Sequence, residues 1–174
     1  MVTHEYLVYL ASPEMERLAG ITGETVLLCV KIGLYHAFLH SIPSSHEFRI
    51  ANQTSRMGPL HKGAGGKVML AQLAEVELQE VIKHIEFEFS NPSEKEELLK
   101  EISNIRKRGY AIDTNRRIQY ATFIAAPVYG YEAPVEVSIA GLEARISPNK
   151  DAYIERLLET TDRISRALMA TNRP

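Results

Sequence analysis

The grouping of strand-like segments constrains the fold of this 174-residue chain more than any other feature. Residues 24–32 (ETVLLCVKI) are rich in β-branched residues, and two further strand-like segments follow at hairpin intervals, at residues 34–42 and 46–52. Residues 109–113, 120–130 and 134–141 form a second group. Strands joined by short connections pair antiparallel, because a parallel pair needs a long crossover, usually a helix. The sequence therefore predicts an α+β fold with a mostly antiparallel sheet of six strands.

Helical patterns of apolar residues precede, separate and follow the two groups of strands. The expected helices cover residues 3–19, 65–73, 76–85, 93–108 and 153–168. Ser12-Pro13 is an N-cap and first-turn pair, so we expect the first helix to break or restart there. The capping box Ser93-x-x-Glu96 predicts the start of the fourth helix, and Gly109 predicts its end.

Composition places the chain among ordinary globular proteins. The apolar fraction is 45%, the charged fraction is 24% and the net charge is −2, which excludes a stand-alone nucleic-acid binder with a global basic field. The length indicates one domain over residues 1–174. A single cysteine, no bilayer-spanning apolar run and no signal pattern together predict a cytoplasmic protein without a membrane partner.

A glycine-rich loop lies directly before an apolar helical pattern, at residues 58–73 (GPLHKGAGGKVMLAQL). Glycines at the start of a helix expose N–H groups at the positive end of its dipole, which favours an anion such as a nucleotide, a coenzyme or a small carboxylate. The loop fails the phosphate-loop pattern at His61 and Val68, and it does not follow the first strand of a βαβ unit. An acyl-coenzyme-A loop, or glycines that merely allow tight helix packing, remain as alternatives.

Three other features allow a chemical or a structural interpretation. His36 and His40 share a face of a predicted strand, but no Cys, Asp or Glu converges on them, so we expect half-exposed histidines and no metal site. Cys29 has no neighbouring histidine or cation, which favours a buried, inert thiol over a nucleophile. The basic residues 106–108 occupy a last helical turn, where the dipole favours cations whether or not phosphate binds.

Strand alternation predicts a pocket for a small polar ligand. Asp113 shares a face with Ala111 at the end of its strand, and Phe123 among small residues provides an apolar wall. On the last strand, the residues at 135, 137 and 139 are apolar and share one face. The opposite face carries polar or small residues, namely Glu136, Ser138 and Ala140.

These segments, in this order, resemble the effector-binding domain of the IclR family of transcriptional regulators. The matching stretches cover nearly the whole chain: GETVLLCV, GPLHKGAGGKVMLAQL, EISNIRKRGYAID, FIAAPVYGYEAPVEVSIAGLEARIS and the closing helix. The resemblance implies a GAF-like or profilin-like α+β fold with a curved six-stranded antiparallel sheet, flanked by helices and assembled into dimers or tetramers. It also implies a sensor rather than an enzyme, with a small organic effector, often a carboxylate, bound on the concave face of the sheet.

The resemblance carries site residues over by position. Those positions are Ala64 and Gly65, whose amides would face an anionic group, with Asp113, Phe123, Ser138 and Ala140. Lys62 departs from the small residue usual there and is either a counter-charge or a solvated side chain. Phe123 and Ala140 replace smaller or hydroxyl-bearing residues, which implies a more apolar pocket. Residues 114–120 (TNRRIQY) replace an acidic, glycine-containing turn.

The family's winged-helix domain has no counterpart in this chain, because no helix-turn-helix candidate with basic flanks precedes the first strand. We therefore expect a sensor domain that affects DNA binding only through a winged-helix domain absent from this chain, and that needs no cofactor. Two alternatives come from other classes. One is an acyltransferase that uses the glycine loop for acyl-coenzyme A, and the other is a dimerisation module whose concavity has collapsed.

Overall fold

The computed structural model describes residues 4–50, 57–115 and 120–171. The elements in chain order are α1 (Glu5–Thr22), β1 (Thr25–Ile32), β2 (Tyr35–Ile42), β3 (Met57–Pro59), α2 (Gly63–Ala71), α3 (Glu75–Ile85), the 3₁₀ turn η1 (Glu86–Glu88), α4 (Pro92–Arg108), β4 (Ala111–Asn115), β5 (Ala121–Val128), β6 (Val135–Leu142) and α5 (Glu143–Thr171). The strands form one sheet in the order β3-β2-β1-β6-β5-β4, and all neighbouring pairs are antiparallel. The expected α+β fold with a six-stranded antiparallel sheet is confirmed.

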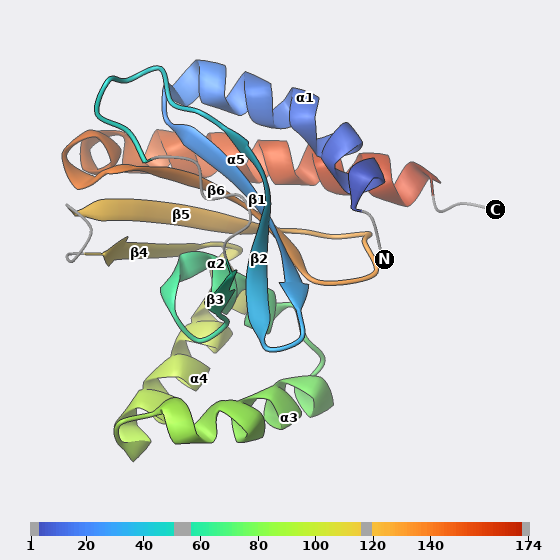
Figure 1. Cartoon of the computed structure of the whole chain (residues 1–174), viewed down its shortest axis with the longest axis vertical. Coiled ribbons are helices and arrows are strands. Elements are labelled where there is room, and N and C mark those ends of the chain that lie inside the picture. Colours follow the sequence, from blue (N-terminus) through green and yellow to red (C-terminus); the bar gives the residue numbers. More distant parts are fainter. Residues whose placement is uncertain (1–3, 51–56, 116–119, 172–174) are drawn as a thin grey trace.

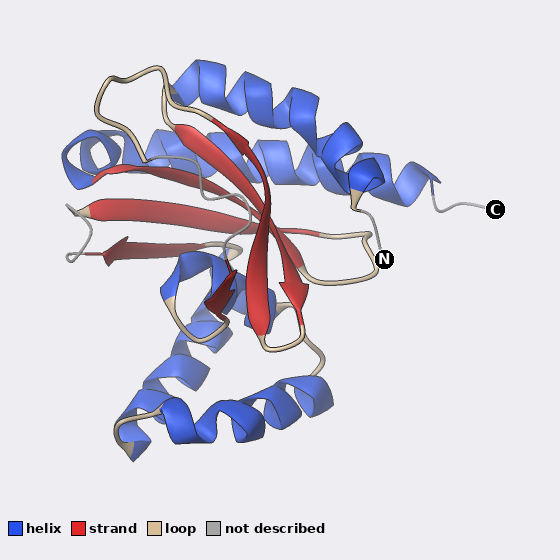
Figure 2. Cartoon of the chain, in the orientation of Figure 1, coloured by secondary structure: helices blue, strands red, loops and turns tan. Residues whose placement is uncertain are grey.

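The sheet separates two layers of helices. Helices α1 and α5 run side by side along one face, while α2 lies against the other face, with α3 and α4 beyond it (Figure 1). The same view coloured by secondary structure shows the curl of the strands between these layers (Figure 2). Among the helices described for this chain, none combines the length and the apolar character needed to cross a lipid bilayer.

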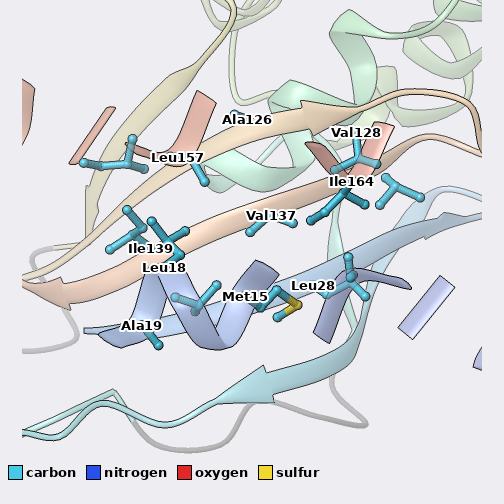
Figure 3. Close-up of a cluster of buried hydrophobic side chains, with 14 of the residues drawn as sticks. Met15, Leu18, Ala19, Leu28, Ala126, Val128, Val137, Ile139, Leu157 and Ile164 are labelled. Carbon is cyan, nitrogen blue, oxygen red and sulfur yellow. The ribbon is translucent and has the colours of Figure 1, made fainter. Parts of the chain in front are cut away.

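The central strands are buried on both faces. Residues Val135, Val137 and Ile139 of β6 point into the core beneath α1 and α5, as their alternation predicts. Figure 3 shows Val137 and Ile139 in this core, together with side chains from both helices. A second apolar cluster on the opposite face joins β1 to α2, α3 and α4. Burial of each large aliphatic side chain contributes about 1.5–3 kcal/mol, so this two-sided packing dominates the stability of the fold.

The expected break in the first helix is wrong, because α1 continues through Ser12-Pro13. The buried residues Leu7, Ala11 and Met15 lie on both sides of the proline and form one apolar face against the sheet. Burial of that face outweighs the roughly 3 kcal/mol that an interior proline costs a helix. The helix ends at Gly23, whose φ is 71° and whose N–H donates to the Ala19 carbonyl over 2.8 Å.

The third strand does not lie at residues 46–52. The structure places β3 at Met57–Pro59, where it pairs with residues 35–37 of β2. Residues 46–50 form no strand, and residues 51–52 lie outside the described residues. Side chains hold this segment instead, since Thr25 Oγ1 donates to the Ile50 carbonyl over 3.0 Å. The β-propensity of residues 46–50 is therefore outweighed by a side-chain hydrogen bond from β1.

Two helix starts also differ from expectation. Helix α4 begins at Pro92 rather than at Ser93, because Asn91 is its cap and Asn91 Oδ1 accepts from the Glu94 N–H over 3.1 Å. The expected capping box at Ser93 is therefore wrong, and Ser93 Oγ donates to Glu97 Oε1 instead. Its end at Gly109 is confirmed, with a φ of 84°. Helix α5 begins ten residues before the expected residue 153, at Glu143.

A buried ion pair explains the early start of α5. Glu24 is fully buried, and Arg145 in the first turn of α5 donates to both of its carboxylate oxygens, over 2.6 and 2.9 Å. Tyr153 Oη adds a hydrogen bond to the carbonyl of Thr22 at the end of α1. Removing one partner of such a pair costs about 3–5 kcal/mol, because the other charge stays buried. The pair therefore fixes α5 against the junction of α1 and β1.

A substitution at Gly66 tests how closely α2 packs against the loop before it. A Cβ at Gly66 would lie 2.3 Å from the carbonyl oxygen of Leu60, whereas a Cβ at the exposed Gly20 of α1 meets nothing within 4 Å. We expect Gly66→Ala to lower the free energy of unfolding by about 1–3 kcal/mol, the usual cost of overpacking. The matched control Gly20→Ala should leave it unchanged or raise it by up to about 1 kcal/mol. Urea denaturation measures both, and equal effects would contradict the predicted clash.

Candidate functional site

A cavity of about 280 Å³ lies between the curled sheet and the start of α2, and we call it the cup. Its volume is just below the usual range for small-molecule sites, about 300–1,000 Å³. The residues that line it are His36, Phe38, Pro59, Lys62, Gly63, Ala64, Gly65, Asp113, Asn115, Phe123, Glu136 and Ser138. The structure thus brings six of the seven sequence-predicted residues to this one cavity, namely Lys62, Ala64, Gly65, Asp113, Phe123 and Ser138.

The first turn of α2 forms one side of the cup. The chain turns into the helix at Gly63, whose φ of +76° favours glycine. The N–H groups of Gly63, Ala64 and Gly65 belong to this first turn and have no carbonyl one turn earlier within the helix. Together with the helix dipole, they offer an anion both hydrogen bonds and a positive partial charge.

Gly65 also sets how close α2 comes to the sheet. A Cβ at this position would lie 2.7 Å from Glu136 Oε1, so only glycine allows the present contact between α2 and β6. The glycine loop therefore serves tight packing as well as the exposure of amides. The packing interpretation of the loop holds for Gly66, which lies against Leu60, whereas Gly63 lines the cup.

Strands β4 and β5 provide the opposite wall. Asp113 and Phe123 are direct partners in the register of these strands, and both are partly buried. Phe123 is in turn the register partner of Ala140 on β6. Ala140 is fully buried next to Phe123 and does not line the cup, so it affects the cavity only through the aromatic ring. Lys62 is exposed at the mouth.

The floor of the cup holds a residue whose role sequence reasoning missed. Glu136 is 1% exposed, lies between Ser138 and Gly65, and is the register partner of Cys29 on β1. Burial raises the pKa of Glu136 to about 7, although hydrogen bonds with Cys29 and Ser138 oppose the rise. Its Oε2 has no hydrogen-bond partner within the described parts of the chain. Alternation already placed Glu136 beside Ser138, but a lone acidic residue on a strand usually faces solvent.

Cys29 is an inert thiol, as the sequence favours. The side chain is fully buried, and both burial and the neighbouring Glu136 raise its pKa well above the usual value. A thiol that stays protonated is a poor nucleophile. Its role is to donate toward the Glu136 carboxyl and to fill the second apolar cluster.

The two histidines of β2 do not share a face, contrary to expectation. Leu28 pairs with His40 while Cys29 pairs with Phe38, so Leu39 is an extra residue in a β-bulge. The bulge sends His40 toward α1, where Nε2 lies 3.2 Å from Ser12 Oγ, and sends His36 into the cup. Burial lowers the pKa of His36. Among the residues that the structure describes, no three His, Cys, Asp or Glu side chains cluster as metal ligands.

Two of the basic residues at the end of α4, Arg106 and Arg108, make contacts that hold the fold together. Arg106 donates to the carbonyls of Ala71 and Leu73, over 3.0 and 2.8 Å, and so caps the end of α2. Arg108 donates to the Tyr110 carbonyl over 2.6 Å and pairs with Glu101. These contacts favour the structural interpretation of the run and link α4 to the helix that forms the cup.

Comparison with known proteins defines the class. Residues 1–166 match the family model for the C-terminal region of the bacterial transcriptional regulator IclR. The chain therefore belongs to the IclR family of bacterial transcriptional regulators, and it corresponds to their C-terminal, effector-binding domain. The resemblance seen in the sequence is confirmed.

Individual relatives agree with this assignment. The HTH-type transcriptional regulator KipR of Bacillus subtilis is 28% identical over 165 residues, which are 91% of this chain and 66% of KipR. BhcR of Paracoccus denitrificans is 30% identical over 166 residues, which are 88% of this chain and 58% of BhcR. The chain thus spans less than two thirds of either relative's length.

Solved structures give the same fold. The Thermotoga maritima IclR structure superposes with a TM-score of 0.79 at 26% identity, over 94% of this chain and 68% of that one. The C-terminal domain of Escherichia coli KdgR superposes with a TM-score of 0.77 at 23% identity, over 94% and 98% of the two chains.

The buried Glu136 predicts a pH dependence of stability. Its pKa is about 7 in the folded domain and 4.5 without the fold, so between these values the folded state binds more protons and stability falls as pH rises. We expect Glu136→Gln to have the same free energy of unfolding as the parent near pH 4.5. At pH 8 the variant should be more stable by up to about 3 kcal/mol. Urea denaturation at both values measures this, and a difference that does not change with pH would contradict it.

Proposed function

We propose that this domain senses a small organic anion, most simply a carboxylate, which binds in the cup and changes how the regulator binds DNA. The observation that carries the proposal is the convergence on one 280 Å³ cavity of first-turn amides from α2 and polar side chains from β4 and β6. A cavity of this size suits a small metabolite. It also disfavours a dimerisation module whose concavity has collapsed.

Each wall of the cup has a proposed role. The amides of Ala64 and Gly65 hold the anionic group, and the side chains of Asp113 and Ser138 orient the ligand by hydrogen bonds. Phe123 packs against its apolar part. Lys62 at the mouth is either a counter-charge or a solvated side chain, and its exposure weakens any charge pairing there through solvent screening.

DNA binding is proposed to come from a winged-helix domain that is not among these 174 residues. The relatives named above are HTH-type transcriptional regulators, and they extend beyond the region that matches this chain. We further propose a cytoplasmic homodimer or homotetramer. The exposed aromatic side chains Tyr6 and Tyr9 on α1, 48% and 74% exposed, are consistent with a surface that another copy covers.

A thermal-shift screen of small organic acids tests the proposed function. A ligand that binds only the folded state at ten times its Kd stabilises the domain by about 1.4 kcal/mol. For a domain of this size, that corresponds to a rise in Tm of about 3–6 °C. No stabilisation by any acid at millimolar concentration across a broad panel would count against sensing. Calorimetric titration with acetyl-coenzyme A separates the acyltransferase alternative, because a sensor of small acids should give no heat.

Ser138→Ala tests the position of the site. Loss of one hydrogen bond of about 1 kcal/mol should weaken binding of a panel hit about fivefold, while the Tm of the free protein stays close to that of the parent. Ser93→Ala, at an exposed position of α4, is the matched control and should leave the Kd unchanged. An unchanged Kd for Ser138→Ala would remove Ser138 from the site.

A further inference from the structure

The charges around the cup do not suit a ligand that is only an anion. Two carboxyl groups, Asp113 and Glu136, line the cavity, and Lys62 is the one Lys or Arg side chain among its described lining residues. Lys62 is exposed at the mouth, whereas Glu136 is at the floor. His36 adds no positive charge near neutral pH, because burial lowers its pKa. A simple carboxylate would therefore bring a further negative charge toward two acidic groups.

Glu136 also has an unmet need for a hydrogen-bond donor. Glu136 lines the cup, its Oε2 is buried and has no partner among the residues described, and Cys29 and Ser138 interact with the same carboxyl group. A buried polar atom without a partner costs about 1–3 kcal/mol, and more when it is charged. Because Glu136 lines the cup, a donor group on a bound ligand can satisfy it.

The carboxyl group of Glu136 and the amides of the first turn of α2 are close together in space. Glu136 Oε1 lies 2.7 Å from the position of a Cβ on Gly65, so the carboxyl group is adjacent to the first turn of α2. A small molecule can therefore reach the amides of Ala64 and Gly65 with one group and Glu136 with a group one or two carbons away. Phe38 and Phe123 border the same space with aromatic rings.

This inference rests on the proposed function. We propose that the effector is dipolar, a small amino-substituted carboxylic acid. Its carboxylate binds the α2 amides, and its ammonium group pairs with Glu136. Glu136 is then the residue that selects this class. The ammonium supplies the missing donor and compensates the charge of a carboxylate that has no buried cation beside it.

The proposal fixes the sign of a pH effect. The titratable groups that face Glu136 are Cys29 from β1, His36 from β2 and Asp113 from β4, with Lys62 before α2. Cys29 stays a thiol, because burial raises its pKa, and burial lowers the pKa of His36, which disfavours its charged form. Glu136, with a pKa of about 7, is the group that changes charge between pH 6 and 8. An ammonium ligand should therefore bind up to about tenfold more tightly at pH 8 than at pH 6.

The test uses acids that differ in one substituent, with the purified chain in a calorimeter at pH 6, 7 and 8. One set is propionate, lactate and alanine, and the other is propionate, 3-hydroxypropionate and β-alanine. In at least one set, the amino member should bind at least tenfold more tightly than propionate, with affinity rising with pH. Glu136→Gln should abolish that preference and its pH dependence. Glu155→Gln, which makes the same charge change at an exposed site on α5, should keep both.

The outcomes separate this inference from the proposed function. Propionate or the hydroxy acids binding as tightly as the amino acids, or affinity rising as pH falls, would overturn the dipolar effector while leaving a carboxylate sensor intact. An amino preference that survives Glu136→Gln would also overturn it. Absence of binding in both sets, together with a thermal-shift panel without hits, would overturn both proposals. Urea denaturation of Glu136→Gln shows that any loss of binding is not a loss of fold.

Discussion

The covering of β1 and β6 on both faces is the constraint on which the rest of the structure depends. Residues 25–30 of β1 and 135–141 of β6 are all buried, so each must belong to one of two interiors. One set of alternate residues packs beneath α1 and α5, and the other faces α2. The polar residues Glu136 and Ser138 fall in the second set, so their hydrogen bonds must be met by neighbours or by a ligand. The site is thus a direct result of how the sheet is buried.

The two helical layers are fastened to the sheet by different physical means. On the α1–α5 side, the buried pair of Glu24 and Arg145 adds charge-assisted hydrogen bonds to apolar packing. On the α2 side, close backbone contact at Gly65 and Gly66 replaces side-chain interdigitation. Arg106 of α4 holds the far end of α2 through two carbonyls. The helix that presents amides to the cup is therefore held at both of its ends.

Sequence reasoning succeeds here where local periodicity and burial agree. Five of the six strands, the end of α4 at Gly109 and the common face of Asp113, Phe123 and Ser138 follow from such patterns. It fails where a distant partner decides. Pro13 stays helical because the sheet buries its neighbours, and the α4 cap belongs to Asn91 although Ser93 fits the consensus.

Glu136 and the glycines of α2 show that a single sequence does not reveal burial that depends on distant residues. Strand alternation places Glu136 on the same face as Ser138 but does not show whether solvent reaches that face. The burial of Glu136 depends on α2, whose residues lie more than sixty positions earlier in the chain. The family resemblance implies the concave face but gives no role to Glu136.

The bulge at Leu39 divides β2 between the two interiors. Because side chains alternate with a period of two, one surplus residue exchanges inside for outside along the remainder of a strand. Deleting Leu39 would leave Phe38 and His40 adjacent in the chain and opposite Cys29 and Leu28, so the ladder would become regular and each half of the strand would keep its face. The surplus residue is therefore what sends His36 and His40, four residues apart, to different interiors of the domain.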